Sequence, residues 1–306
     1  MDIEPSTLTP KAVSIDIELT NACNAKCSFC PRDNMPAIGT MKPDIFYKAV
    51  ERGLELPTNT TFGFCGTGDS MLNKHLVEYT RHLSSCGKDV QLATNGYLLD
   101  EAKAEKLLDA GIKQVTFSIA SMGEIYDKVY DLDFETTHSN ILRFIEMAKG
   151  ICDVRVAIVH HDEDEPYEEY AKYWRSVGVN MIRNYDLINR GGALFTTESL
   201  SDEAVAKARE DLEEQGKFPV CFTPFLTVFI GWDGNYYLCC SDWKKEVPVG
   251  HVSTHSIQET YAKRVEAVHS RKPICETCTL DPINQMALEP VRFLDEIPAE
   301  AVYGRA

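Results

Sequence analysis

The sequence predicts an α/β fold built on a parallel sheet, and three observations support that class. Runs of apolar and β-branched residues alternate with helical patterns from residue 12 to about residue 190. Most of these runs are apolar nearly throughout, which is typical of parallel strands covered on both faces. Glycines also stand where four helices should stop, as left-handed caps: Gly87, Gly111, Gly150 and Gly178.

The predicted elements alternate along the chain as successive β–α units. Strands are expected over residues 12–20, 60–65, 89–94, 114–120, 153–160 and 179–187. Helices are expected over residues 43–54, 74–86, 100–110, 136–149 and 166–177. Six such units are too few to close an eight-stranded barrel, and their crossovers should be right-handed. Active sites of such folds gather where the strands end, so the loops after the strands are the candidate chemical positions.

The last third of the chain changes character. Residues 191–219 are predicted to be a connection with a helix over residues 201–216, capped by Ser201. Residues 220–306 are predicted to form a small second domain. It begins with a β-hairpin that turns at residues 233–235, and a helix follows over residues 256–270. The tail from residue 279 carries three prolines and is expected to be mostly irregular.

Composition excludes several classes. No apolar run reaches about 18 residues, so no membrane span is expected, and the first residues do not resemble a secretory signal. The net charge of −16 disfavours a nucleic-acid partner, which needs a basic footprint. Most of the eleven cysteines fall in metal-binding spacings, which favours cofactor binding in a reducing cytoplasm over disulfides.

A C-x-x-x-C-x-x-C run directly follows the first predicted strand. Its cysteines are Cys23, Cys27 and Cys30. Three thiolates on one tight loop suit three corners of a [4Fe–4S] cluster, whereas ferredoxins supply four cysteines. The remaining iron would then be open to bind a ligand. A structural zinc loop is the alternative.

A second cysteine set lies in the last section: Cys221, Cys239, Cys275 and Cys278. Four thiolates suit either a tetrahedral zinc site or a second [4Fe–4S] cluster. Cys240 is the neighbour of Cys239, and adjacent residues on a strand point to opposite faces. Only one of the two should therefore join this site, and the choice between them is open.

The first run, with Phe29 before its last cysteine, resembles the signature of the radical S-adenosylmethionine (SAM) superfamily. The second set resembles that superfamily's SPASM/Twitch auxiliary-cluster domain. The resemblance implies a partial (β/α)6 TIM-like barrel over residues 12–190 and a Twitch domain within residues 220–306. It implies a [4Fe–4S] cluster held by the first set, an open iron that binds SAM, and a second [4Fe–4S] cluster held by the second set. It also implies an electron donor such as flavodoxin or ferredoxin.

The resemblance further implies a SAM pocket. In the family a glycine-rich turn with an acid follows the second strand and holds the SAM amino group. The matching residues, including those at the ends of strands three and four, are Gly66, Thr67, Gly68, Asp69, Thr94, Asn95 and Ser118. An aspartate here replaces the usual glutamate, and Asn95 also suits an ordinary turn. Arg155 on the fifth strand would meet the SAM carboxylate or pair with an acid.

Two reactions fit one auxiliary cluster once a 5′-deoxyadenosyl radical has abstracted hydrogen. One is epimerisation with a thiol hydrogen donor, as in neomycin C epimerase. The other is dehydrogenation, as in 2-deoxy-scyllo-inosamine dehydrogenase. Epimerisation is favoured, with Cys240 as donor and Cys65 as the next candidate. Cys86 and Cys152 are expected to be small buried hydrophobic residues.

The acidic residues 162–165 follow the fifth strand. With the net charge, they predict a small cationic amino sugar or aminoglycoside as substrate, although a solvated surface also explains them. His160 and His161 are candidate bases or ordinary loop residues, and Trp243 would face substrate or pack. Modification of a ribosomally made peptide is a third alternative. It is disfavoured because the first strand begins by about residue 12, which leaves no room there for a leader-binding domain.

Overall fold

The computed structural model describes residues 14–57, 59–271 and 273–287. All six predicted strands are present: β1 Ser14–Ile17, β2 Thr61–Phe64, β3 Val90–Thr94, β4 Gln114–Ser118, β5 Asp153–His160 and β6 Met181–Asp186. They pair in parallel in the order β6-β5-β4-β3-β2-β1. The α/β class with a parallel sheet is therefore confirmed.

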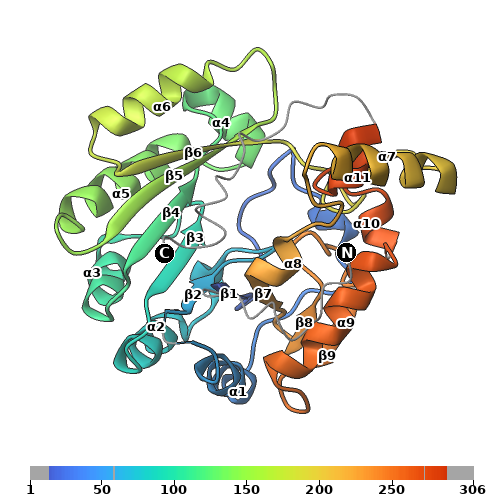
Figure 1. The fold of residues 1–306 in the computed structure, drawn as a ribbon. Coiled ribbons are helices and arrows are strands. Elements are labelled where there is room, and N and C mark those ends of the chain that lie inside the picture. The colour runs from blue at the N-terminus through green and yellow to red at the C-terminus, as the bar shows by residue number, and fades with distance from the viewer. Residues whose placement is uncertain (1–13, 58, 272, 288–306) are drawn as a thin grey trace.

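The helices of the β–α units lie around the outside of the curved sheet (Figure 1). They are α1 Pro43–Leu54, α2 Leu76–Ser85, α3 Glu101–Asp109, α4 Gly123–Tyr130, α5 Phe134–Met147 and α6 Tyr167–Ser176, with short 3-10 turns η2 Arg32–Asn34 and η3 Ser70–Leu72. All four predicted cap glycines have positive φ angles. Helix α4 was not predicted; it fills the connection between β4 and α5 and buries Tyr126 and Tyr130.

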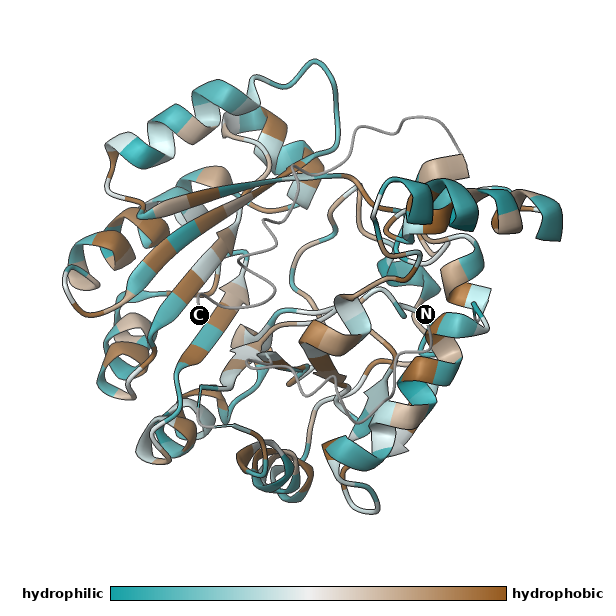
Figure 2. Ribbon diagram, viewed as in Figure 1, coloured by the Kyte–Doolittle hydropathy of each residue, from teal (hydrophilic) through white to brown (hydrophobic). Residues whose placement is uncertain are grey.

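The strands are less uniformly buried than their apolar composition predicts. Along β5, Val154, Val156 and Ile158 are buried, while the residues between them are partly exposed. β3 and β4 show the same alternation. One face of the sheet packs against the helices, and the other faces the interior of an open barrel. Figure 2 shows mostly hydrophobic strands and hydrophilic outer helix turns.

The C-terminal hairpin extends the same sheet. Strands β7 Thr227–Ile230 and β8 Asn235–Tyr237 are antiparallel, as predicted, and β9 Pro248–His251 follows β8. β7 also pairs in parallel with β1, which gives one sheet of nine strands. The small C-terminal domain predicted from the sequence therefore continues the barrel sheet through its strands. Because the barrel is open, β1 has a free edge, and β7 takes it.

The remaining helices are α7 Asp202–Glu214, α8 Thr223–Leu226, α9 Ile257–His269, α10 Pro273–Glu276 and α11 Pro282–Ala287. Ser201 caps α7 as predicted, by accepting from the backbone N–H of Ala204. Helix α11 lies within the tail that is predicted to be mostly irregular. Its proline stands where no helical N–H is needed, and the Asp281 carboxylate accepts from two of its first N–H groups.

The start of the first predicted strand and the tail beyond residue 287 lie outside the described residues. Within the described ranges, every helix is too short or too polar to cross a membrane.

Candidate active site

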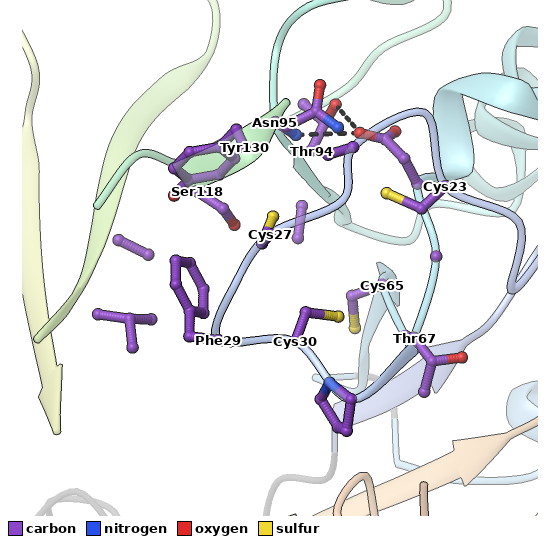
Figure 3. A pocket seen from close by; sticks show the side chains of 18 of the residues that line it. Cys23, Cys27, Phe29, Cys30, Cys65, Thr67, Thr94, Asn95, Ser118 and Tyr130 are labelled. Carbon is purple, nitrogen blue, oxygen red and sulfur yellow. Dashed lines mark hydrogen bonds between the residues drawn. The ribbon is translucent and has the colours of Figure 1, made fainter. Parts of the chain in front are cut away.

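Cys23, Cys27 and Cys30 line one cavity of about 190 Å³ at the carboxyl ends of the strands. Figure 3 shows them along the loop that follows β1. The predicted SAM-pocket residues that line the same cavity are Phe29, Gly66, Thr67, Gly68, Asp69, Thr94, Asn95 and Ser118. Sequence positions far apart are thus brought to one place by the parallel strand order.

The cysteine loop is held by its neighbours rather than by regular structure. The backbone N–H groups of Lys26 and Ser28 donate to the last carbonyls of α4, at 2.9 Å each. The side-chain amides of Asn24 and Asn95 bond reciprocally, at 3.0 and 3.4 Å. This anchoring fixes the loop to α4 and to the end of β3.

The thiols of this loop suit a cluster with one open iron. Burial raises the pKa of Cys23, Cys27 and Cys30. No fourth cysteine of the loop is available, which matches the donor set of a [4Fe–4S] cluster with one free corner. In the described residues, no three His, Cys, Asp or Glu side chains converge closely enough to hold a single metal ion.

The turn after β2 packs tightly against β1 and the cysteine loop. A Cβ at Gly68 would lie 2.3 Å from the Ala22 carbonyl oxygen, so a larger residue does not fit. Glu18 at the end of β1 is fully buried and accepts from the Thr67 backbone N–H at 3.1 Å and hydroxyl at 2.6 Å. Lys245 lies 3.2 Å from the other Glu18 oxygen and stacks over Phe229. The C-terminal segment therefore braces this turn.

Asp69 is already occupied by protein donors. One carboxylate oxygen accepts from the Thr94 hydroxyl at 2.8 Å and the Asn95 N–H at 3.0 Å. The other accepts from the Met71 N–H at 2.9 Å. Burial raises the pKa of Asp69, and these donors oppose the rise. The contacts make Asp69 a brace between β2 and β3 that also lines the cavity.

Phe29 forms one wall of the cavity and is itself supported. Its ring stacks on His161, with centroids 4.9 Å apart. The buried Ser121 hydroxyl lies 3.0 Å from His161 Nε2 and donates to Glu165 at 2.9 Å. Glu165 also accepts from the Tyr170 hydroxyl at 2.6 Å. His161 thus contacts the cavity wall, while His160 stacks on Tyr167.

The acidic segment predicted to recruit a cation is divided between buried and exposed residues. Glu165 is buried and hydrogen-bonded, and residues 162–164 are exposed and do not line the cavity. Glu165 is therefore an internal anchor for His161. The charge pattern in the sequence could not separate this buried acid from its exposed neighbours.

Arg155 and Cys240 are predicted site residues that do not line the cavity. The Arg155 guanidinium donates to Asp153 at 2.6 Å, near the amino end of β5, so the ion-pair alternative describes it. Cys240 has Arg190 from the cavity lining and Cys221 from the second cysteine set within electrostatic range; burial raises its pKa, and the Arg190 guanidinium opposes that rise. Cys65 does line the cavity, and its thiol hydrogen-bonds to Asp16. Cys86 and Cys152 line neither described cysteine cavity.

Sequence reasoning missed Arg190 and Tyr130, which both line the cavity, and left Trp243 undecided. Arg190 follows the end of β6, so its position after a strand was a usable signal. Tyr130 belongs to the unpredicted helix α4. Trp243 lines the cavity from the C-terminal segment, with the Arg190 guanidinium 5.5 Å from its ring centroid.

The second cysteine set lines a smaller cavity, of about 20 Å³. All four predicted cysteines are present there: Cys221, Cys239, Cys275 and Cys278. Cys240 is absent from the lining, so Cys239 is the member of the pair that faces this set. The side-chain amide of Asn284 in α11 donates to the carbonyls of Cys275 and Cys278 at 2.9 Å each, which fixes the C-x-x-C knuckle.

Comparisons with known proteins match both cysteine regions. The family model of the radical SAM superfamily matches residues 17–173, and that of SPASM, an iron–sulfur cluster-binding domain, matches residues 221–279. A probable GTP 3′,8-cyclase of Methanocaldococcus jannaschii is 31% identical over 147 residues, which is 46% of each chain. One from Saccharolobus solfataricus is 29% identical over 178 residues, 56% of each chain. The chain thus spans about half the length of these curated relatives.

Solved structures share the fold at low identity. The structure of BtrN in complex with AdoMet and 2-DOIA has a TM-score of 0.54 and 17% identity, over 87% of this chain and 92% of that chain. Native anSMEcpe with bound AdoMet has a TM-score of 0.64 and 16% identity, over 90% and 94% of the two chains. Streptococcus suis SuiB bound to precursor peptide SuiA has a TM-score of 0.64 and 11% identity, over 89% and 70%.

Proposed function

Because the chain belongs to the radical SAM superfamily, we propose that it is an epimerase that inverts one carbon of a small substrate, with Cys240 as hydrogen donor. The cofactors of the two matched domains are a [4Fe–4S] cluster with SAM and auxiliary iron–sulfur clusters. When bound, the first cluster and SAM together supply a 5′-deoxyadenosyl radical that abstracts hydrogen from an unactivated C–H group.

The residues of the first cavity bind and orient these groups. Cys23, Cys27 and Cys30 are the cluster ligands. The turn at residues 66–68 brings its backbone close to SAM, as its tight packing against β1 permits. Asp69 acts indirectly, by fixing Thr94 and Asn95 beside that turn. Ser118 at the end of β4 and Phe29 on the cysteine loop complete the lining of the SAM site.

The second cavity supports an auxiliary cluster held by Cys221, Cys239, Cys275 and Cys278. Four thiols are enough to bind every iron of a [4Fe–4S] cluster, so no iron is left open for a substrate. We assign this set to electron transfer. The electron donor for the enzyme is proposed to be a flavodoxin or a ferredoxin.

The separation of Cys239 from Cys240 is the observation that carries the epimerase proposal. Cys239 faces the second cavity with the other three thiols. Cys240 instead lies within electrostatic range of Arg190 and Cys65, which line the first cavity, and also of Cys221 from the second set. A thiol that neither cysteine set needs therefore stands beside the candidate active site.

In the proposed step, the Cys240 S–H bond breaks and a C–H bond forms on the opposite face of the substrate radical. A thiyl radical remains on Cys240. One electron from the flavodoxin or ferredoxin and one proton from solvent restore the thiol. Cys65, which lines the cavity beside Asp16, is the alternative donor.

Turnover in D₂O tests this proposal, because thiol hydrogens exchange with solvent. One deuterium should appear on the inverted carbon. Cys240→Ala should still cleave SAM but yield no inverted product, while Cys65→Ala should invert normally. Normal inversion by Cys240→Ala would remove Cys240 from this role. A product two hydrogens lighter than the substrate would establish dehydrogenation instead.

Residues 162–165 supply no free carboxylate to the cavity lining, because Glu165 is buried and hydrogen-bonded and the other three lie outside that lining. Similarity to BtrN concerns the fold alone at 17% identity. The substrate class is better argued from the charges that do line the cavity.

A further inference from the structure

Arg190 is a cation without an acidic partner in the first cavity. Among the described residues that line this cavity, it and Asp69 are the only members of the Asp, Glu, Lys and Arg types. Asp69 is occupied by three protein donors. Arg190 makes no ion pair and no side-chain hydrogen bond with any described residue. Its guanidinium is therefore available to a ligand.

The position of Arg190 is fixed by the structure around it. Asn189 is fully buried, and its amide bonds to the Thr277 carbonyl at 2.5 Å and to the Thr279 N–H at 3.1 Å. Arg190 itself has a φ angle of 53°, a left-handed conformation that costs a non-glycine residue energy. Its guanidinium carbon lies over the Trp243 ring, 5.5 Å from the ring centroid. These contacts hold the charge at one place.

A cation–π contact at this distance uses none of the guanidinium N–H donors, so they remain for planar acceptors. A guanidinium matches a carboxylate or a phosphate, which it binds with two parallel hydrogen bonds. Half-burial in a cavity strengthens this attraction relative to water. A cationic amino group, in contrast, would meet repulsion from Arg190 and no free carboxylate in the described lining.

We propose that Arg190, supported by Trp243, is a subsite for an anionic carboxylate or phosphate group of the substrate. This inference rests on the proposed function. The proposed donor Cys240 must reach the substrate, and Arg190 lies within electrostatic range of Cys240. The SAM carboxylate is the other source of the same chemistry. The net charge of −16 reflects the whole chain and does not describe this cavity.

Inorganic phosphate is a suitable probe, because reversible binding to a slowly tumbling protein broadens its ³¹P resonance. The SAM-bound, cluster-loaded enzyme should broaden this resonance saturably. Arg190→Gln should weaken phosphate binding about tenfold or more, as expected for loss of a charged hydrogen-bond donor. Arg190→Lys should retain part of the binding. Arg175→Gln makes the same charge change on the exposed end of α6 and should leave binding unchanged.

Absence of saturable broadening in the wild type, or equal broadening in Arg190→Gln, overturns the subsite. Iron content and circular dichroism confirm that each variant is loaded and folded. A second arm compares S-adenosylhomocysteine with 5′-methylthioadenosine, which lacks the carboxylate. If Arg190→Gln weakens only the first, Arg190 binds the SAM carboxylate and the substrate assignment falls. Neither arm depends on inversion, so failure here is distinct from failure of the epimerase proposal.

Discussion

The first cysteine cavity measures about 190 Å³ and the second about 20 Å³. The first is lined by three predicted cluster ligands together with a glycine turn, polar strand ends and the charged side chains of Asp69 and Arg190. The second is lined by four predicted ligands, with Thr223, Ser241 and Asp281 as its other polar residues. One site leaves a ligand position and space beside it, and the other leaves neither. This difference supports the proposed roles, which are substrate chemistry at the first site and electron transfer at the second.

Loss of the first cysteine set should have the largest effect. Reconstituted wild-type protein should hold about eight irons per chain, and the Cys23→Ala, Cys27→Ala, Cys30→Ala triple variant about four. SAM cleavage should fall below detection, because no other described thiol set offers an open iron. Iron analysis and 5′-deoxyadenosine assays measure both results. Cys86→Ala and Cys152→Ala are controls that should change neither, and persistent cleavage in the triple variant would contradict the assignment.

Variants at the two adjacent cysteines, Cys239 and Cys240, should differ in the iron content of the protein. Cys239→Ser should lose about four irons per chain, whereas Cys240→Ser should keep about eight. The physical reason is that only Cys239 faces the second cavity. Electron paramagnetic resonance of the reduced proteins would identify which cluster is missing. Iron loss in Cys240→Ser would reverse the orientation, and stoichiometric zinc in the second site would replace the auxiliary cluster altogether.

The buried pair of Glu18 and Lys245 links the two regions and should be costly to break. Lys245→Met leaves the Glu18 carboxylate buried without its cation, which typically costs about 3–5 kcal/mol. Thermal unfolding of the loaded enzyme should shift to lower temperature. SAM affinity should also fall, because Glu18 holds Thr67 in the turn. The exposed neighbour provides a control, Lys244→Met, which should match wild type. Equal behaviour of the two variants would show that the pair does not couple the regions.

Asp69→Asn should produce the smallest of these effects. The asparagine NH₂ group would face the Thr94 and Asn95 donors, and each buried donor left unpaired costs about 1–3 kcal/mol. SAM affinity measured by titration should fall about tenfold, with iron content unchanged. The exposed Asp109→Asn is the matched control. Unchanged SAM affinity in Asp69→Asn would remove its bracing role.

Much of the fold could be predicted because it depends on local patterns. The six strands, the cap glycines and the Ser201 cap follow from short runs and single residues. Helix α4 and strand β9 lacked such signals. The prolines predicted a mostly irregular tail, but Pro282 stands at the start of helix α11, where proline is favoured.

The candidate site was predicted where it follows chain order and missed where it depends on distant contacts. Loops after parallel strands meet at one edge, so Phe29, Thr94 and Ser118 share the cavity as expected. Arg155 was misplaced because strand alternation gives the face of a residue but not its height in the barrel. Glu165 was misread because its burial depends on Ser121 and Tyr170.

The sequence by itself determined which cysteines must lie close together, since three thiols within eight residues share a loop and a C-x-x-C knuckle brings two thiols together. Only the tertiary structure decided that Cys239, and not Cys240, lines the second cavity, and that Arg190 meets Trp243 in the lining of the first. Spacing constrains atoms within one loop. The pairing of β7 with β1 joins segments far apart in the chain, and its register is set by packing of the whole sheet.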